Sequence, residues 1–468
     1  MTCTGEPSSL ALEYVSDAIS HSFISADDHQ PMTGTSSTPL AAALGAAAQD
    51  FAERNPASAM LAARAATVMP GGNTRTSLWY DPFPLYMASG QGGRLTDVDG
   101  HDYRDFLNEF TSGIFGHSPP VLRTALLEAF DRGLSLSSHH ALEIELAAEI
   151  CGRFASIDRL RFTNSGTEAS LMAIAAAKLF TGREAIIVAE GGYHGTGITF
   201  GHDVPAGSLP HRFVVVPYND IDALTAAVAE HQSDLAAILI EPMLGAGGCI
   251  PGTPAFLSAA QQLCRDQGAL FILDEVQTAR LAVGGRQSQL GLTPDLTTLG
   301  KFFGGGLAFG CFGGRADIME MFDPRRDNGV AHSGTFNNNS LAMATGLAAC
   351  RTLLGAETLA DLNGKGDRLR ERLTACFERH VAPFHVSGLG SIMNIHPHGD
   401  AATVAAWRKL LFFDLVERGF YFAPRGLVVL SLVTTDDDIA AFLAAMDSAL
   451  EARADLFDHV CLDGAVTT

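Results

Sequence analysis

The sequence predicts an α/β protein built on a mainly parallel β-sheet. Between residues 108 and 350, short apolar segments alternate with longer stretches of helical character. The apolar segments are residues 160–162, 186–189, 213–216, 237–240, 269–273 and 296–299. Segment 269–273 (Ala-Leu-Phe-Ile-Leu) is a continuous apolar run, which is typical of a strand buried on both faces of a parallel sheet.

The segments on either side of this alternation have a different character. Residues 1–50 are rich in Ala, Ser, Thr and Asp, which predicts a poorly ordered leader with short helices near 9–20 and 40–53. Residues 86–106 alternate turns and short strands, which predicts a hairpin. The C-terminal part is expected to contain two long amphipathic helices and two short strands, at 356–380, 401–418, 391–396 and 427–432.

Composition excludes several classes of partner. A formal net charge of −21 argues against nucleic acid and anionic membranes. No stretch approaches 18 consecutive apolar residues, so no membrane span is expected. The first basic residue is Arg54, so residues 1–53 lack the basic segment of a signal peptide. Eight cysteines show neither a CxxC pair nor zinc-ligand spacing, which favours reduced thiols, a cytoplasmic enzyme and no metal site.

Lys301 is one of four lysines and has unusual surroundings. It follows an apolar segment that ends at Gly300 and precedes Phe302-Phe303-Gly304. Burial among apolar residues lowers the pKa of a lysine toward the neutral amine, which is the form that reacts with carbonyl groups. The alternative is a solvated lysine in a glycine-rich surface loop.

Asp274 directly follows the predicted strand 269–273. Ligands of such sheets bind at the carboxyl ends of the strands. A buried carboxylate there requires a cationic partner, and the protonated pyridine nitrogen of pyridoxal phosphate (PLP) is one. The alternative is a strand-end aspartate that caps the next helix.

Two further turns lie at predicted strand ends. Ser165 and Glu168 have capping-box spacing ahead of an alanine-rich helix, and a small-residue turn that opens a helix is also an anion site. Tyr193 lies among glycines after segment 186–189, where an aromatic ring can cover a planar ligand. A purely structural cap and an ordinary loop tyrosine remain the alternatives.

The motifs in this order resemble those of class III aminotransferases of PLP fold type I. They are NSGTEA (164–169), GGYHG (191–195), IEP (240–242), LDEV (273–276), DLTTLGK (295–301), GGG (304–306) and SGTFNNN (333–339). Within the class, PGGNTRTSLWYDPFPL (70–85), FNNN (336–339) and PRGLVVLSL (424–432) are most similar to the β-phenylalanine, or aromatic β-amino acid, aminotransferases. Glutamate-1-semialdehyde aminomutases share DLTTLGK and GGGL.

The resemblance implies a fold and a domain plan. A mainly parallel seven-stranded sheet is expected in a large domain, beside a small α+β domain. The boundaries that we expect are a leader at 1–50, the first part of the small domain at 51–107, the large PLP-binding domain at 108–350 and the second part of the small domain at 351–468. The chain departs from the ornithine and γ-aminobutyrate branch at two positions. Ala246 stands where that branch has a gating glutamate, and Ala279 follows Thr278 where that branch usually has a phenylalanine.

The resemblance also implies roles around the PLP ring. Lys301 is expected to hold PLP as a Schiff base and then to move the proton between the substrate carbon and the cofactor. Asp274 is expected to pair with the ring nitrogen, with Val276 and Tyr193 on the two ring faces and Gln277 near the ring hydroxyl.

A second set of roles concerns the phosphate. Ser165, Gly166 and Thr167 are expected to bind it, with Thr335 supplied by a partner chain across the interface of a homodimer. The expected cofactor-binding residues are therefore Ser165, Gly166, Thr167, Tyr193, His194, Glu241, Asp274, Val276, Gln277, Lys301 and Thr335.

A transaminase binds two acids in turn, so it needs an arginine fork for carboxylates. Arg75 and Arg425 are the candidates, and Tyr80, with Trp79, Phe83 and Phe422, belongs to either an aromatic pocket or the core.

Three functional hypotheses follow. The first is transamination of a β-amino acid of aromatic type, with 2-oxoglutarate or pyruvate as acceptor. The second is a 2,1-aminomutase, and the third is a PLP-fold protein without catalysis, which the joint presence of the lysine, the aspartate and the phosphate turn disfavours.

Overall fold

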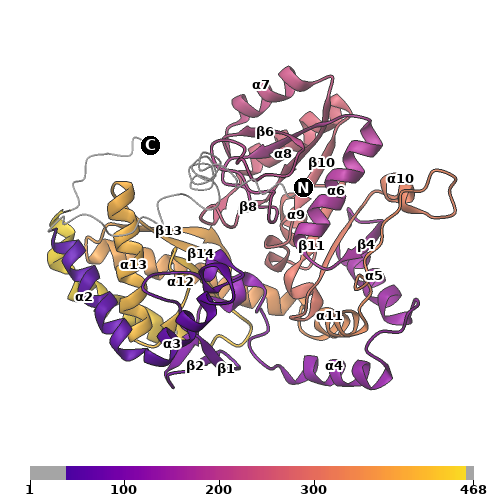
Figure 1. Ribbon diagram of the computed structural model, residues 1–468. Coiled ribbons are helices and arrows are strands. Elements are labelled where there is room, and N and C mark those ends of the chain that lie inside the picture. The colour runs from indigo at the N-terminus through magenta and orange to yellow at the C-terminus, as the bar shows by residue number, and fades with distance from the viewer. Residues whose placement is uncertain (1–37, 460–468) are drawn as a thin grey trace, which may run out of the picture.

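The structure, a computed structural model, describes residues 38–459, and its largest sheet has seven strands, several of which are labelled in the right half of Figure 1. In spatial order the strands are β4 (Arg159–Thr163), β12 (Gly310–Gly314), β11 (Leu296–Gly300), β10 (Leu270–Asp274), β7 (Leu235–Ile240), β5 (Ala185–Ala189) and β6 (Arg212–Val216). Only β12 is antiparallel to its neighbours. The predicted mainly parallel sheet is confirmed.

Helices cover both faces of this sheet. Helix α6 (Gly166–Thr181) packs on one face and α8 (Pro254–Gln267), beside α7 (Ile221–His231), on the other. Successive side chains of β5 divide between these layers, because Ile186 lies in the core with α6 and Ile187 in the core with α7 and α8. Such two-sided burial explains why the strands read as continuous apolar runs.

Strand β12 was missing from the pattern of apolar segments. Its sequence, Gly-Cys-Phe-Gly-Gly, contains too few side chains to give a strand signal. The glycines are required by close packing: a Cβ at Gly310 would lie 2.1 Å from the Ser165 carbonyl oxygen, and one at Gly314 would lie 2.0 Å from that of Asp295. The formation of β12 therefore depends on packing against segments that are distant in the sequence, and not on its own residue pattern.

The N-terminal hairpin and the C-terminal part share a sheet, as expected. Strand β15 (Phe420–Tyr421) pairs in parallel with β3 (Asp102–Asp105) and so extends the predicted hairpin. The other elements of this part are β1 (Met87–Gln91), β2 (Arg94–Asp97), β13 (Phe384–Leu389), β14 (Ile392–Pro397), β16 (Leu427–Val429), α12 (Ala356–Arg379), α13 (Ala401–Glu417) and α14 (Asp436–Ala452). The two long predicted helices are α12 and α13.

The end of the predicted leader is structured rather than poorly ordered. Helix α2 (Pro39–Arg54) matches the helix predicted near 40–53, and it packs against α13 through the buried side chains of Leu44 and Phe51. Thr38 caps it by accepting a hydrogen bond from the Ala41 N–H. The helix predicted near 9–20 lies outside the described residues, and the domain boundaries stay a prediction.

The remaining elements connect these parts. They are α3 (Pro56–Ala66), α4 (Pro120–Arg132), α5 (Ala141–Arg153), α9 (Gly285–Leu290), α10 (Ala316–Met319), α11 (Ser340–Thr352), β8 (Met243–Leu244), β9 (Ile250–Pro251) and the short 3₁₀ turns η2 (Pro70–Gly72), η3 (Thr76–Leu78), η4 (Asn108–Thr111), η5 (Thr278–Leu281), η6 (Lys301–Gly304), η7 (Glu320–Phe322) and η8 (Ala454–His459). Among residues 38–459, no helix combines the length and apolar character that crossing a membrane requires.

Candidate active site

Asp274 and Lys301 lie at the same edge of the large sheet. Asp274 is the last residue of β10, and Lys301 follows the last residue of β11. The two strands are parallel neighbours, with Asp274 in register with Thr298. Because ligands bind at the carboxyl ends of such strands, the structure brings these two predicted residues together where a ligand is expected.

The Lys301 side chain is partly buried and contacts other polar groups. Its Nζ donates to Thr111 Oγ1 at 3.1 Å. Burial lowers the pKa of Lys301 to about 8, although the negative charges of Glu241 and Asp274 oppose this shift. Lys301 is therefore not a solvated surface lysine, and near pH 8 a large fraction of it is the nucleophilic amine.

Asp274 is buried and hydrogen-bonded on both oxygens. It is 4% exposed, its Oδ2 lies 2.8 Å from His194 Nδ1, and its Oδ1 accepts from the Val276 N–H at 3.0 Å. It caps no helix, because the next turn, η5, begins at Thr278, and its N-cap residue is Gln277, which forms no side-chain cap. His194 Nε2 is buried and has no hydrogen-bond partner within the described part of the chain. His194 and the Val276 N–H thus hold the Asp274 carboxylate at the carboxyl end of β10.

In the turn before α6, Ser165 caps the helix as its spacing predicts, but the return bond of a capping box goes from Glu168 to Asn164 rather than to Ser165. Ser165 Oγ accepts from the Glu168 N–H at 3.1 Å, and Glu168 Oε2 accepts from the Asn164 N–H at 2.9 Å. The structural interpretation of these residues is therefore correct, and the helix N-terminus that they form also remains an anion site.

Two other predicted segments converge on this turn. A Cβ at Gly166 would lie 3.0 Å from methyl carbons of Val276, so Val276 lies over the start of α6. A Cβ at Gly195, whose φ is +125°, would lie 2.3 Å from Thr167 Oγ1. The lack of side chains here lets the Tyr193 loop reach the helix N-terminus, and the Tyr193 side chain is 46% exposed.

Glu241 organises the neighbouring loops. Its Oε1 accepts from the Tyr193 N–H at 2.9 Å and its Oε2 from the Gly245 N–H at 3.0 Å. Burial raises the pKa of Glu241 to about 7. Gln277 is also buried, and its amide oxygen lies 1.4 Å from where a Cβ of Gly245 would stand, so a side chain at position 245 would displace this amide.

A left-handed turn that the sequence did not predict faces Lys301. Residues Asn108–Thr111 all have φ between 46° and 79°, although none is glycine. This conformation costs about 1–2 kcal/mol per residue, so the surroundings must impose it. Asp105 Oδ1 accepts from the Asn108 N–H, Asn108 Nδ2 donates to the Val429 oxygen at 2.7 Å, and Arg280 Nη1 donates to the Thr111 oxygen at 3.1 Å.

Arg280 is another residue that the sequence analysis missed. It is fully buried, donates to the main-chain oxygens of Thr111 and Leu430, and forms no ion pair among the residues described. Its positive charge contributes to lowering the pKa of Lys301. An arginine within the apolar run Ala279–Val283 was an available signal of a buried cation.

The two predicted carboxylate-binding arginines lie on one aromatic ring. The guanidinium carbon of Arg75 is 5.3 Å from the centroid of Phe110, and that of Arg425 is 5.5 Å from it. Arg75 also forms an ion pair with Glu109. The left-handed turn thus gathers two cations that are distant in sequence beside the residue that contacts Lys301.

Tyr80 was a candidate either for an aromatic substrate pocket or for the core, and the structure favours the core. It is 5% exposed and packs against Phe51 and Phe412 with ring centroids 6.1 and 4.7 Å away. Its hydroxyl accepts from the Leu85 N–H at 2.7 Å. Tyr80 belongs to the core, because the aromatic cluster with α2 and α13 covers it.

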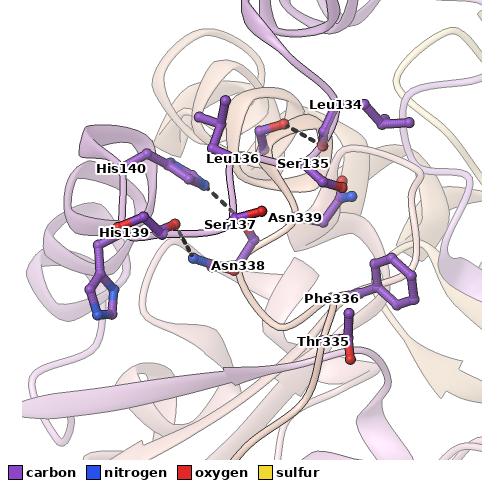
Figure 2. A pocket seen from close by; sticks show the side chains of 12 residues that line it. Leu134, Ser135, Leu136, Ser137, His139, His140, Thr335, Phe336, Asn338 and Asn339 are labelled. Carbon is purple, nitrogen blue, oxygen red and sulfur yellow. Dashed lines mark hydrogen bonds between the residues drawn. The ribbon is translucent and has the colours of Figure 1, made fainter.

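Thr335 lies apart from the lysine and aspartate. It is exposed and lines a pocket of about 500 Å³ between residues 134–140 and 335–340 (Figure 2). Figure 2 shows Thr335 and Phe336 on the side of this pocket away from His139 and His140. The same segment reaches the phosphate turn, because Asn164 Nδ2 donates to Asn337 Oδ1 at 3.0 Å.

One group of metal-ligand residue types lies far from these motifs in the sequence. Ligand atoms of Cys376, His380 and Asp447 gather within 4.8 Å of one another. Arg379 donates to both Cys376 Sγ and Asp447 Oδ1. A guanidinium cation already pairs with these groups, so they make a poor cation site.

Comparison with known proteins agrees with this geometry. The family model for class-III aminotransferases matches residues 76–450. The chain is 48% identical to a β-phenylalanine transaminase from Variovorax paradoxus over 414 residues, which cover 87% of this chain and 95% of that protein. The solved structure of a β-phenylalanine aminotransferase from the same organism superposes with a TM-score of 0.87 at 46% identity, covering 89% of this chain and 99% of that chain.

Two other relatives extend the comparison. A glutamate-1-semialdehyde 2,1-aminomutase from Sorangium cellulosum is 40% identical over 431 residues, which cover 86% of this chain and 98% of that protein. A transaminase solved with PLP bound is 32% identical, with a TM-score of 0.82, covering 86% of this chain and 99% of that chain. These neighbours have PLP fold type I, as predicted. The chain therefore belongs to the class-III aminotransferase family, whose cofactor is pyridoxal 5′-phosphate.

Proposed function

We propose that this PLP-dependent aminotransferase acts on a β-amino acid, of aromatic type, with 2-oxoglutarate or pyruvate as the amino acceptor. The convergence of Arg75 and Arg425 on Phe110, in the turn that contacts Lys301, carries this proposal. The identity to a β-phenylalanine transaminase supports the choice of donor.

The residues at the sheet edge fit PLP. When bound, PLP supplies a carbonyl group for an amine and a ring that stabilises negative charge on the adjacent carbon. Asp274, held by His194, would pair with the ring nitrogen, and Val276 and Tyr193 would cover the two ring faces. The buried carboxylate at 2.8 Å from His194 supports this assignment, because a buried charge requires a cationic partner.

The phosphate would bind at the start of α6. Ser165, Gly166 and Thr167 form the helix N-terminus, which favours an anion through its N–H groups and dipole. Gln277 would lie near the ring hydroxyl, and Glu241 would hold the loop that carries Tyr193.

Lys301 would hold PLP through its amine and would move the proton at the substrate carbon. Its lowered pKa supports both roles, because the neutral amine is the nucleophile and also the base. Thr111 Oγ1, which accepts from Lys301 Nζ, would orient the amine.

We infer a homodimer in which Thr335 reaches the phosphate of the partner subunit. Exposed apolar side chains beside Thr335 support an interface at this surface, since Leu134, Leu136 and Phe336 are 50%, 45% and 60% exposed.

The cysteines described between 38 and 459 are all free thiols, which supports a cytoplasmic location.

An acceptor-dependence assay tests the proposed reaction. We expect PLP-loaded enzyme to convert β-phenylalanine only when 2-oxoglutarate or pyruvate is present, whereas an α-amino acid panel should react more slowly. The relationship to the aminomutase makes glutamate 1-semialdehyde the matched control substrate. Turnover of that compound without any keto acid, together with no reaction of β-phenylalanine, would establish an aminomutase instead.

A further inference from the structure

Glu109 already occupies one of the two arginines proposed to bind carboxylates. Its Oε1 pairs with Arg75 Nη1, and both side chains are roughly half exposed. Arg75 lies at the same time over the ring of Phe110, the next residue in the chain. The guanidinium is therefore held by an anion and by an aromatic face that the same turn supplies.

The backbone of the turn enforces this arrangement. Glu109 and Phe110 have φ values of 50° and 51°, which side chains of their size rarely adopt. Hydrogen bonds from Asn108 to Val429 and from Arg280 to Thr111 anchor both ends of the turn. Because the strained turn is anchored at both ends, the surrounding structure holds the Glu109 carboxylate beside Arg75.

We propose that Glu109 is a positioning residue that competes with the substrate carboxylate for Arg75. This inference rests on the proposed role of Arg75 in carboxylate binding. A transaminase must bind and release two acids in every cycle. When the Glu109 carboxylate takes the place of the departing acid, Arg75 exchanges one anion for another and keeps an ion-pair partner throughout.

The competition also distinguishes Glu109 from the gating glutamate of the ornithine and γ-aminobutyrate branch. That position is Ala246 in this chain. Glu109 comes from a different segment, and it pairs with Arg75. Glu109 would therefore weaken the binding of carboxylates to Arg75. Glu109 belongs to the same turn as Thr111, which contacts Lys301.

Calorimetric binding of unreactive acids to the PLP-loaded protein tests this inference. The probes are 3-phenylpropanoate and glutarate, which carry neither an amine nor a ketone. Because an exposed ion pair changes an equilibrium constant by up to about fivefold, we expect Glu109→Gln to tighten 3-phenylpropanoate two- to fivefold. Glu109→Asp, which keeps the charge on a shorter side chain, should give a smaller gain. Glu371→Gln, an exposed charge-matched change on α12, should leave the Kd unchanged.

A double-mutant cycle separates competition at Arg75 from a general charge effect. We expect Arg75→Ala to weaken binding of 3-phenylpropanoate more than that of glutarate, and Glu109→Gln to have no further effect in the Arg75→Ala background. If Arg75→Ala weakens binding but Glu109→Gln does not tighten it, the competition is refuted and the carboxylate role of Arg75 stands. If Arg75→Ala leaves both affinities unchanged, that role and the competition fall together.

Discussion

Removal of the Asp274 carboxylate should stop the chemistry while leaving the fold in place. Asp274 is 4% exposed, accepts from the Val276 N–H at 3.0 Å and lies 2.8 Å from His194 Nδ1. Asp274→Ala removes the charge and both hydrogen bonds, whereas Asp274→Asn keeps the shape and removes the charge. The two variants thus separate the electrostatic contribution from packing.

The expected loss of rate follows from the burial of this charge. Breaking a buried charge pair by removing one partner costs roughly 3–5 kcal/mol, which corresponds to about 10²–10⁴-fold if it is lost in the transition state. The loss of stability should be smaller, about 1–3 kcal/mol for an unpaired buried group. The Asp274 charge raises the pKa of Lys301, so in the variants without this charge the pKa of Lys301 should fall below 8.

Single-turnover absorbance changes of the cofactor, with saturating PLP and the amino donor alone, measure this effect. Asp274→Glu should be impaired less than Asp274→Ala. The control is Asp295→Asn at the opposite end of β11, where Asp295 Oδ2 accepts from the Phe271 N–H at 2.8 Å, so a comparable hydrogen bond is weakened away from the site. An Asp274→Ala variant within threefold of the wild-type rate would refute the role in pairing with the ring nitrogen.

Borohydride reduction followed by peptide mapping should label Lys301 among the four lysines, and a label on any other lysine would overturn the assignment. Reaction of the apo-protein amine with an aldehyde should rise with pH with a midpoint near pH 8, because the lowered pKa makes half of Lys301 neutral there. Glu241→Gln should move this midpoint to lower pH, since the Glu241 charge raises the pKa of Lys301; an unchanged midpoint would contradict their coupling. In stopped-flow half reactions, Arg75→Ala should weaken the donor step and Arg425→Ala the acceptor step, each by about 10–150-fold in kcat/KM for a lost charge-assisted contact, and equal losses in both steps would mean that one arginine serves both acids. Deletion of residues 1–37 should leave the activity and Tm nearly unchanged, because no motif residue lies before Pro70, and a large loss of either would show that this segment contributes to the fold or the site.

Local sequence patterns were sufficient for the main strands and for the central pair of residues. Buried parallel strands require continuous apolar runs, and those runs located β10 and β11. Once the strands were placed, the edge of the sheet that binds ligands was fixed, and Asp274 and Lys301 followed from their positions at the strand ends. The motif order then indicated the family.

Other features depend on contacts between segments that are far apart in the chain. Strand β12 exists because its glycines fit between β4 and β11, and the left-handed turn at 108–111 exists because Arg280 and Val429 anchor it. Neither the strand nor the turn is marked by a local pattern in the sequence.

The environment of each side chain was likewise decided by packing. Tyr80 is a core residue because α2 and α13 cover it. Arg75 and Arg425 meet on Phe110 across 350 residues of chain because the turn holds that ring between them. The sequence by itself determined that Asp274 and Lys301 lie at strand ends on the ligand-binding edge of the sheet, since residue types and strand-end positions are local properties. Only the tertiary structure decided which charges surround them, because electrostatic interactions depend on distance in space rather than along the chain.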